Sequence, residues 1–121
     1  MNLKNPKLTA LRFNDCINDR GIDGLSKLMT EAHTLVDRGG KVRNSKSCVT
    51  RCWMEFFRMF PDYRNFFGRV ESRDDLVVIL GYAFWSAESP FDPAIWTARI
   101  QDDLVAEWRI YEDSIFFDSE L

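Results

Sequence analysis

The sequence lacks the features that mark membrane, secreted and nucleic-acid-binding chains. No stretch of its 121 residues approaches the roughly 18 consecutive apolar residues of a membrane-spanning helix. Residues 1–13 show no apolar run typical of a secretory signal. Sixteen Lys and Arg against nineteen Asp and Glu give a net charge of −3. We therefore expect neither nucleic acid nor a membrane as a partner.

Cysteine and histidine are also scarce. The three cysteines, Cys16, Cys48 and Cys52, show no zinc-type spacing, and we expect reduced thiols in a cytoplasmic protein. Cys48 and Cys52 lie four residues apart, but with the single histidine, His33, they still lack a fourth ligand. We therefore predict no metal site. Phosphate-binding glycine loops and the GxSxG and HExxH motifs are absent, and we predict no cofactor.

Aromatic residues, in contrast, are abundant. Ten Phe, four Trp and three Tyr make up 14% of the chain. A small domain needs fewer rings to close its core, so some of them are expected to line a cavity or an interface.

Apolar spacing divides the chain into a helical first half and a strand-rich second half. Helices are predicted over 6–20, shortly after Gly21 and over 45–60, and strands over 30–37, 41–44, 62–72, 76–87, 95–101 and 104–112. The absence of regular β-α alternation favours an α+β fold. We expect a curved antiparallel sheet with three helices against one face.

The predicted strand over 76–87, LVVILGYAFWSA, is apolar on both faces. Such a strand must be covered twice, and no further helix is available for the second face. A homodimer that buries the outer sheet face is the expected solution, by a two-fold contact. The alternative is that these side chains are simply exposed at modest cost.

Three stretches resemble the SnoaL-like branch of the nuclear-transport-factor-2-like superfamily. They are GIDGLSKLMTEAHTLVD, CWMEFFRMFPDYR and WTARIQDDLVAEWRIYED, in this order along nearly the whole chain. The resemblance implies one domain over 1–121, a cone-shaped α+β fold whose helices and sheet enclose a pocket. The superfamily includes isomerases, epoxide hydrolases and polyketide cyclases as well as non-catalytic modules, so the fold does not decide the function.

Asp37 is the first candidate catalytic residue. It lies where the resemblance to ketosteroid isomerases places the general-base aspartate, and burial at an apolar cavity would raise the pKa of its carboxyl group. The alternative is that Asp37 only begins the turn formed by Arg38, Gly39 and Gly40. At the positions of the isomerase oxyanion donors the chain has Phe13 and Trp96, so we do not expect steroid isomerase activity.

His33 is the second candidate. It lies four residues before Asp37, which places the two side chains on the same face of the predicted strand. The two side chains could form an acid–base or ligand-anchoring pair in one pocket. The alternative is a buried neutral histidine that is hydrogen-bonded to a nearby group.

Six aromatic residues are candidates for the ligand-binding wall. Five of them combine an apolar ring face with a polar edge, and Phe13 is wholly apolar. Core packing is the alternative role for each of the six. The six residues are Phe13, Trp53, Tyr82, Trp96, Trp108 and Tyr111. Period-two spacing places Trp108 and Tyr111 on opposite faces of the last strand and leaves open which one faces inward.

Together these observations predict a pocket protein that binds a small hydrophobic molecule carrying a carbonyl or hydroxyl group. If it is catalytic, the class is a cofactor-independent isomerase, cyclase or hydrolase in which Asp37 is the base and His33 the acid or the orienting group. The alternative is a non-catalytic ligand-binding or dimeric association module of the same fold.

Overall fold

A computed structural model describes residues 5–111 and contains three helices: α1 (Pro6–Asn18), α2 (Ile22–Lys27) and α3 (Lys46–Met59). Local chemistry explains their ends. The Asn5 side chain accepts a hydrogen bond from the Lys7 backbone N–H before α1, and the Ser45 side chain accepts one from the Cys48 N–H before α3. Pro61 follows the end of α3. No helix within the described range is long and apolar enough to cross a membrane.

The six strands form one sheet in the order β2-β1-β6-β5-β4-β3. Their bounds are Met29–Val36 (β1), Val42–Asn44 (β2), Arg64–Arg73 (β3), Leu76–Phe84 (β4), Asp92–Gln101 (β5) and Leu104–Tyr111 (β6). The turn between β5 and β6 places Asp102 and Asp103 at positive φ angles, as a tight two-residue hairpin turn requires. The α+β class predicted from the sequence is confirmed.

One strand pair differs from the expected antiparallel sheet. β1 pairs in parallel with β6, whereas the other four neighbouring pairs are antiparallel, so the sheet is mixed. The physical reason is that β1 and β6 are separated by most of the chain, and a short hairpin, which enforces antiparallel pairing, connects only consecutive strands. The sheet is not closed into a barrel.

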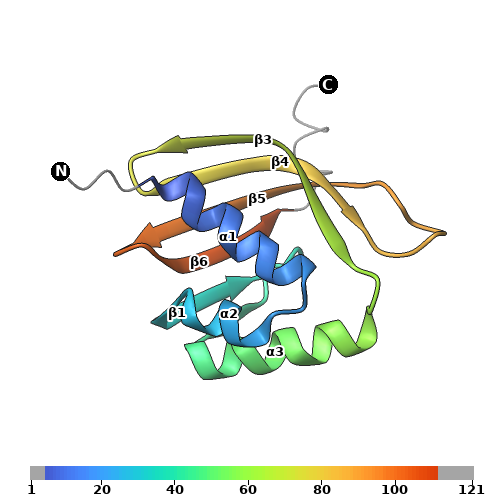
Figure 1. Cartoon of the computed structure of the whole chain (residues 1–121), viewed down its shortest axis with the longest axis horizontal. Coiled ribbons are helices and arrows are strands. Elements are labelled where there is room, and N and C mark those ends of the chain that lie inside the picture. Colours follow the sequence, from blue (N-terminus) through green and yellow to red (C-terminus); the bar gives the residue numbers. More distant parts are fainter. Residues whose placement is uncertain (1–4, 112–121) are drawn as a thin grey trace.

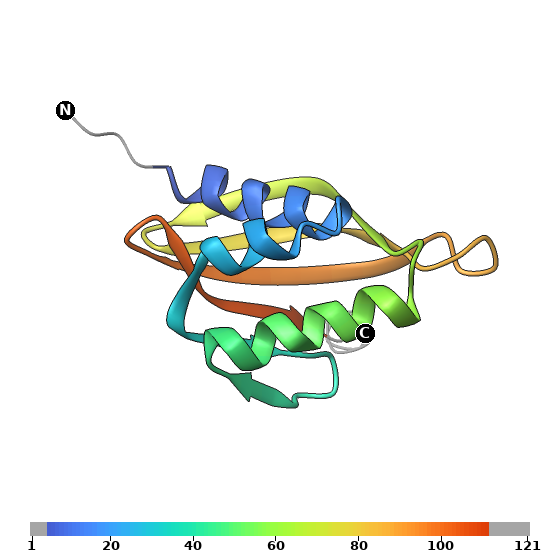
Figure 2. The same ribbon diagram turned by 60° about the horizontal axis from the view of Figure 1, so that its bottom comes forward.

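All three helices pack on one face of the sheet, which we call the inner face. α1 contacts strands β3 to β6 and lies across them in Figure 1. α3 contacts β1 and β2, beside which it runs in Figure 2, and α2 lies between the other two helices. The core lies between this layer and the inner face, where Val77, Ile79, Trp96, Ala98 and Trp108 are fully buried.

The opposite face of the sheet, the outer face, carries no helix from residues 5–111. Phe66 stacks on Tyr82, and Tyr82 also contacts Phe91. Phe91 is 72% exposed, Leu80 42% and Phe66 40%. We call these four residues the outer aromatic patch. The strand with two apolar faces is therefore covered on its inner side only.

Candidate functional site

A cavity of about 740 Å³ lies between α3 and the inner face of the sheet. Its size is typical of a small-molecule site. Apolar side chains from β1, α3, β6 and the two ends of the β3–β4 hairpin form most of its wall: Leu35, Trp53, Phe56, Met59, Tyr63, Trp85 and Ile110. The turn after β1 and the exposed side of α3 form a charged rim with Asp37, Arg38, Arg43, Arg51 and Glu55.

An aromatic cluster closes one end of the cavity. Trp85 contacts Tyr63, Phe60 and Phe56 with ring centroids 4.7, 5.0 and 5.7 Å apart, each in an edge-to-face arrangement. Phe56 also lies 4.8 Å from Tyr63. The sequence places these rings together because Phe56 and Phe60 are one turn apart on α3, while Tyr63 and Trp85 flank the β3–β4 hairpin. Burial raises the pKa of the Tyr63 hydroxyl far above its ordinary value, so that group is neutral.

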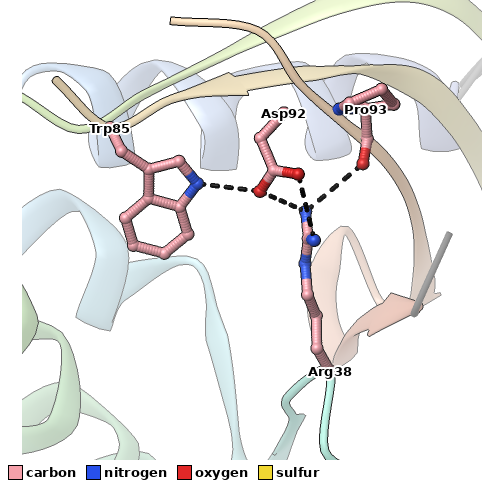
Figure 3. Close-up of polar contacts among 4 residues, drawn as sticks. All are labelled: Arg38, Trp85, Asp92 and Pro93. Atoms are coloured by element: carbon pink, nitrogen blue, oxygen red, sulfur yellow. Dashed lines mark hydrogen bonds and ion pairs between the residues drawn. The ribbon is translucent and has the colours of Figure 1, made fainter. Parts of the chain in front are cut away.

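Arg38 ties two edges of the cavity together (Figure 3). Its guanidinium group binds both carboxylate oxygens of Asp92, with Nη2 2.9 Å from Oδ2 and Nη1 3.2 Å from Oδ1. A further contact reaches the Pro93 carbonyl oxygen at 3.4 Å. The indole N–H of Trp85 donates to Oδ2 of the same carboxylate at 2.8 Å. This bidentate arrangement joins the turn after β1 to the start of β5 and fixes Trp85 in the wall.

Asp37 reaches the cavity, but its environment differs from the one expected for a general base. Arg43 Nη1 lies 3.1 Å from Oδ2, and the Lys41 backbone N–H donates to Oδ1 at 3.0 Å. Burial by itself raises the pKa of the carboxyl group, but these bonds and the Arg43 charge together lower it. The expectation of a raised pKa was therefore wrong. Asp37 also closes the turn after β1. Its backbone N–H donates a hydrogen bond to the Lys41 carbonyl oxygen, and its own carbonyl oxygen accepts one from the Gly40 N–H.

His33 lies in the core instead of on the cavity wall. It is fully buried, its Nδ1 lies 2.6 Å from the Val105 carbonyl oxygen, and its ring is 5.7 Å from Phe13. Because a carbonyl only accepts, Nδ1 carries the hydrogen. Burial lowers the pKa of His33, although the Val105 bond and the Glu107 charge oppose this, so the ring is neutral at pH 7. The structure thus does not bring His33 and Asp37 to one cavity.

Of the six predicted wall residues, the structure places only Trp53 on the cavity. Phe13, Trp96 and Trp108 are fully buried in the core. Tyr82 lies in the outer aromatic patch, on the other side of the sheet. Tyr111 also faces outward, where its hydroxyl meets that of Thr97 at 3.2 Å. A register shift in β6 turns Trp108 inward.

Sequence reasoning missed several residues of the site. Arg38 was assigned only to a turn, and Trp85 only to the apolar strand over 76–87 and to no site. Arg43 and Arg51 carried no motif at all. The available signal was the clustering of three arginines within fifteen residues around the turn and the start of α3. Nothing in the spacing shows that Arg38 reaches Asp92, which is 54 residues away.

The cysteines of α3 also line the cavity. Cys48 and Cys52 lie one turn apart on the helix, and their thiols interact with each other. Burial raises the pKa of the Cys52 thiol despite the opposing charges of Arg43 and Lys41, which keeps it protonated. Within residues 5–111, no three His, Cys, Asp or Glu side chains are placed to hold a metal ion.

Comparison with solved structures identifies the fold. No family model and no curated protein sequence matches the chain. A proposed SnoaL-like polyketide cyclase from Shewanella putrefaciens is 11% identical, with a TM-score of 0.79 over 97% of this chain and 85% of that one. An NTF2-like protein of unknown function from Cytophaga hutchinsonii is 10% identical, with a TM-score of 0.76 over 97% and 99%.

A proposed ketosteroid isomerase from Kribbella flavida is 13% identical, with a TM-score of 0.73 over 88% of this chain and 76% of that one. Identities this low carry no information on substrate or activity, because one fold hosts many functions. The TM-scores and the coverage show that this chain shares the fold of these SnoaL-like and NTF2-like structures.

Proposed function

We propose that this protein binds a small hydrophobic molecule carrying an oxygen function, such as a carbonyl or hydroxyl group, in the cavity beside α3. The observation that carries the proposal is the cavity itself: about 740 Å³, with an apolar wall and a charged rim. Burial of an apolar ligand against Leu35, Phe56 and Ile110 supplies the affinity. The charged rim orients the oxygen function.

Binding is better supported than catalysis. A general base works best when its pKa lies near the working pH, and the Arg43 contact moves the pKa of Asp37 away from that range. The second member of the expected pair, His33, lies in the core. If a cyclase, isomerase or hydrolase activity exists, Asp37 is the remaining candidate base, and Asp37→Asn would abolish turnover without changing ligand affinity much.

The test of binding uses a neutral apolar probe, N-phenyl-1-naphthylamine, whose fluorescence rises in an apolar site. We expect saturable binding of one probe per chain. The variant Cys52→Trp places a large ring on the cavity wall and should abolish this binding. Leu80→Trp adds the same ring to the outer face and should leave binding unchanged. Far-UV circular dichroism and thermal melting verify that both variants are folded.

Two results would overturn the proposal. One is an absence of saturable binding by the wild type. The other is equal binding by the folded Cys52→Trp variant, because a probe that ignores a blocked cavity is bound elsewhere on the surface.

A second candidate function, association through the outer face, rests on the outer aromatic patch. We propose that a second copy of this chain covers it. Three ion pairs, one each on or beside strands β3, β5 and β6, balance the charges around the patch: Arg69–Glu71, Arg99–Asp75 and Arg109–Glu107. An apolar patch that is bordered by paired charges suits a two-fold contact, in which each copy presents the same residues to the other.

Sedimentation equilibrium tests this association. We expect a dimer at micromolar concentration and a shift to monomer in Leu80→Glu, which would bring like charges together at the centre of the contact. Leu8→Glu, at a similarly exposed position on α1, is the matched control and should remain dimeric. A monomeric wild type, or a Leu80→Glu variant that dimerises as well as the wild type, would refute the proposal.

A further inference from the structure

We propose that the cavity selects amphipathic anions: molecules with an apolar, ring-sized body and one acidic group, such as a carboxylate or an enolate, which Arg51 and Arg43 hold at the rim. This inference rests on the proposed binding function and narrows its ligand class. It rests on which polar groups of the cavity wall are available to a ligand.

The neutral donors of the wall are already used or closed off. The Trp85 N–H donates to Asp92. The Trp53 N–H is buried without a partner and without contact with solvent, so a ligand in the open cavity does not reach it. Tyr63 is 4% exposed as a whole residue. A ligand oxygen in this cavity therefore meets the charged rim and the two thiols of α3 instead of a neutral N–H or O–H group.

The arginines of the rim differ in their engagement. Arg38 is held by Asp92 and the Pro93 carbonyl. Arg43 gives one nitrogen, Nη1, to Asp37, which leaves its other donors available. Arg51 forms no ion pair or side-chain hydrogen bond with any residue in the described part of the chain. Arg51 is thus the uncompensated cation of the rim, and Arg43 a partly engaged one.

The acidic groups of the rim do not cancel this charge. Asp37 pairs with Arg43, and the carboxylate of Glu55 lies 3.4 Å from Arg58 and forms no ion pair with Arg51. The positive charges of Arg43 and Lys41 also act on the cavity wall. They lower the pKa of the Cys52 thiol, although burial raises this pKa by more. An acidic ligand group at this rim gains a charge-assisted contact, whereas its apolar body fills the cavity.

A pair of probes with the same ring system tests the selectivity. 1-Anilinonaphthalene-8-sulfonate is an anion, and N-phenyl-1-naphthylamine is its neutral counterpart. We expect the anion to bind about fivefold more tightly or better at low salt, and this advantage to shrink as salt is added. Arg51→Gln should remove most of the advantage and leave the affinity for the neutral probe unchanged.

Three variants make the test specific to the site. Arg12→Gln removes an exposed arginine of α1, far from the cavity wall, and should have no effect on either probe. Glu55→Gln removes an acidic group of the rim and should strengthen binding of the anion. Cys52→Trp should block both probes, which excludes binding of the sulfonate to surface arginines.

The outcomes separate the two proposals. Equal affinities for the two probes, with both blocked by Cys52→Trp, would overturn the anion selectivity and leave the binding function intact. The selectivity would also be overturned if Arg51→Gln bound the anion as tightly as Arg12→Gln does. Failure of both probes to bind the wild type would overturn the binding function itself.

Discussion

The two faces of the sheet are built from similar residues and have opposite surroundings. The inner face carries Trp85, Trp96 and Trp108, and the outer face Phe66 and Tyr82. Helices cover the rings of the inner face. Trp96 and Trp108 pack in the core, and Trp85 lines the cavity. Within residues 5–111, the outer rings contact one another and no other ring. The abundant aromatic residues therefore serve two purposes. The two faces differ in whether helices cover them, and not in the types of residue that they carry.

The polar groups follow the same division. On the outer face three ion pairs lie at largely exposed positions, where each pair contributes little to stability. On the inner side a bidentate Arg38–Asp92 pair fixes the cavity edge, and Arg51 is left uncompensated. An exposed apolar patch suits a second protein copy, whereas a concave apolar surface with spare charge suits a small molecule.

The largest expected effect compares one aromatic deletion on each face. Trp96→Ala should lower the free energy of unfolding by about 3–5 kcal/mol, because it leaves a large void in the core. Phe66→Ala removes a ring that is 40% exposed and should cost about 1 kcal/mol or less. Urea unfolding at low protein concentration measures both. Equal losses would contradict the contrast between the two faces.

The second prediction concerns the pH dependence that His33 imposes on the inner side. Because burial lowers its pKa in the folded state, the unfolded chain binds a proton first as the pH falls through 6.5. The contribution of neutral His33 to the free energy of unfolding is fully present above pH 6.5. Below that pH it declines by up to about 1.4 kcal/mol per pH unit. Urea midpoints between pH 5 and 8 should show this decline.

The matched variant is His33→Gln, which keeps an amide donor for the Val105 carbonyl and has no titrating group. It should be less stable at pH 8 and should show a flatter profile below pH 6.5. If the profile kept the slope of the wild type, another group would be responsible. The Asp37 carboxylate acts in a separate, more acidic range, because its lowered pKa stabilises the fold until the pH falls below about 4.

The smallest expected effect concerns the Arg38–Asp92 pair. Both side chains are about three-quarters buried, so a double-mutant cycle with Arg38→Ala and Asp92→Ala should give a coupling energy of about 1 kcal/mol. The same cycle on the exposed outer pair Arg69–Glu71 should give clearly less. A coupling near zero at Arg38–Asp92 would mean that the bridge does not fix the edge of the cavity.

Sequence patterns predicted the fold well because the fold depends on periodicity. The stripe on α3 indicated the correct helix and its inward side. The alternation along β4 indicated a strand, but the side that was expected to face the pocket, with Tyr82, is the outer one. What the patterns could not predict is the partner of β1, because pairing with β6 joins segments some seventy residues apart. The inward turn of Trp108 depends on a one-residue register shift in β6, which has no signal in the sequence.

The site was predicted less well than the fold. Asp37 and Trp53 were expected at the cavity and lie there, whereas His33 shares the face of Asp37 but lies deeper, under Phe13. Period-two spacing shows which face a side chain takes, not whether a helix covers it. The pKa of Asp37 depends on Arg43, which reaches it across the turn to β2. A contact across a turn depends on the backbone geometry of that turn, which the residue types alone do not determine.

The four indole N–H groups of the protein allow one direct measurement of the central claim. In a ¹H–¹⁵N correlation spectrum each tryptophan side chain gives its own signal. On titration with N-phenyl-1-naphthylamine, we predict that the Trp53 and Trp85 signals shift, because both rings line the cavity, and that those of the core residues Trp96 and Trp108 stay in place. Unchanged Trp53 and Trp85 signals, with shifts confined to the backbone amides of Phe66 and Tyr82, would show that the ligand binds the outer face and would contradict the account.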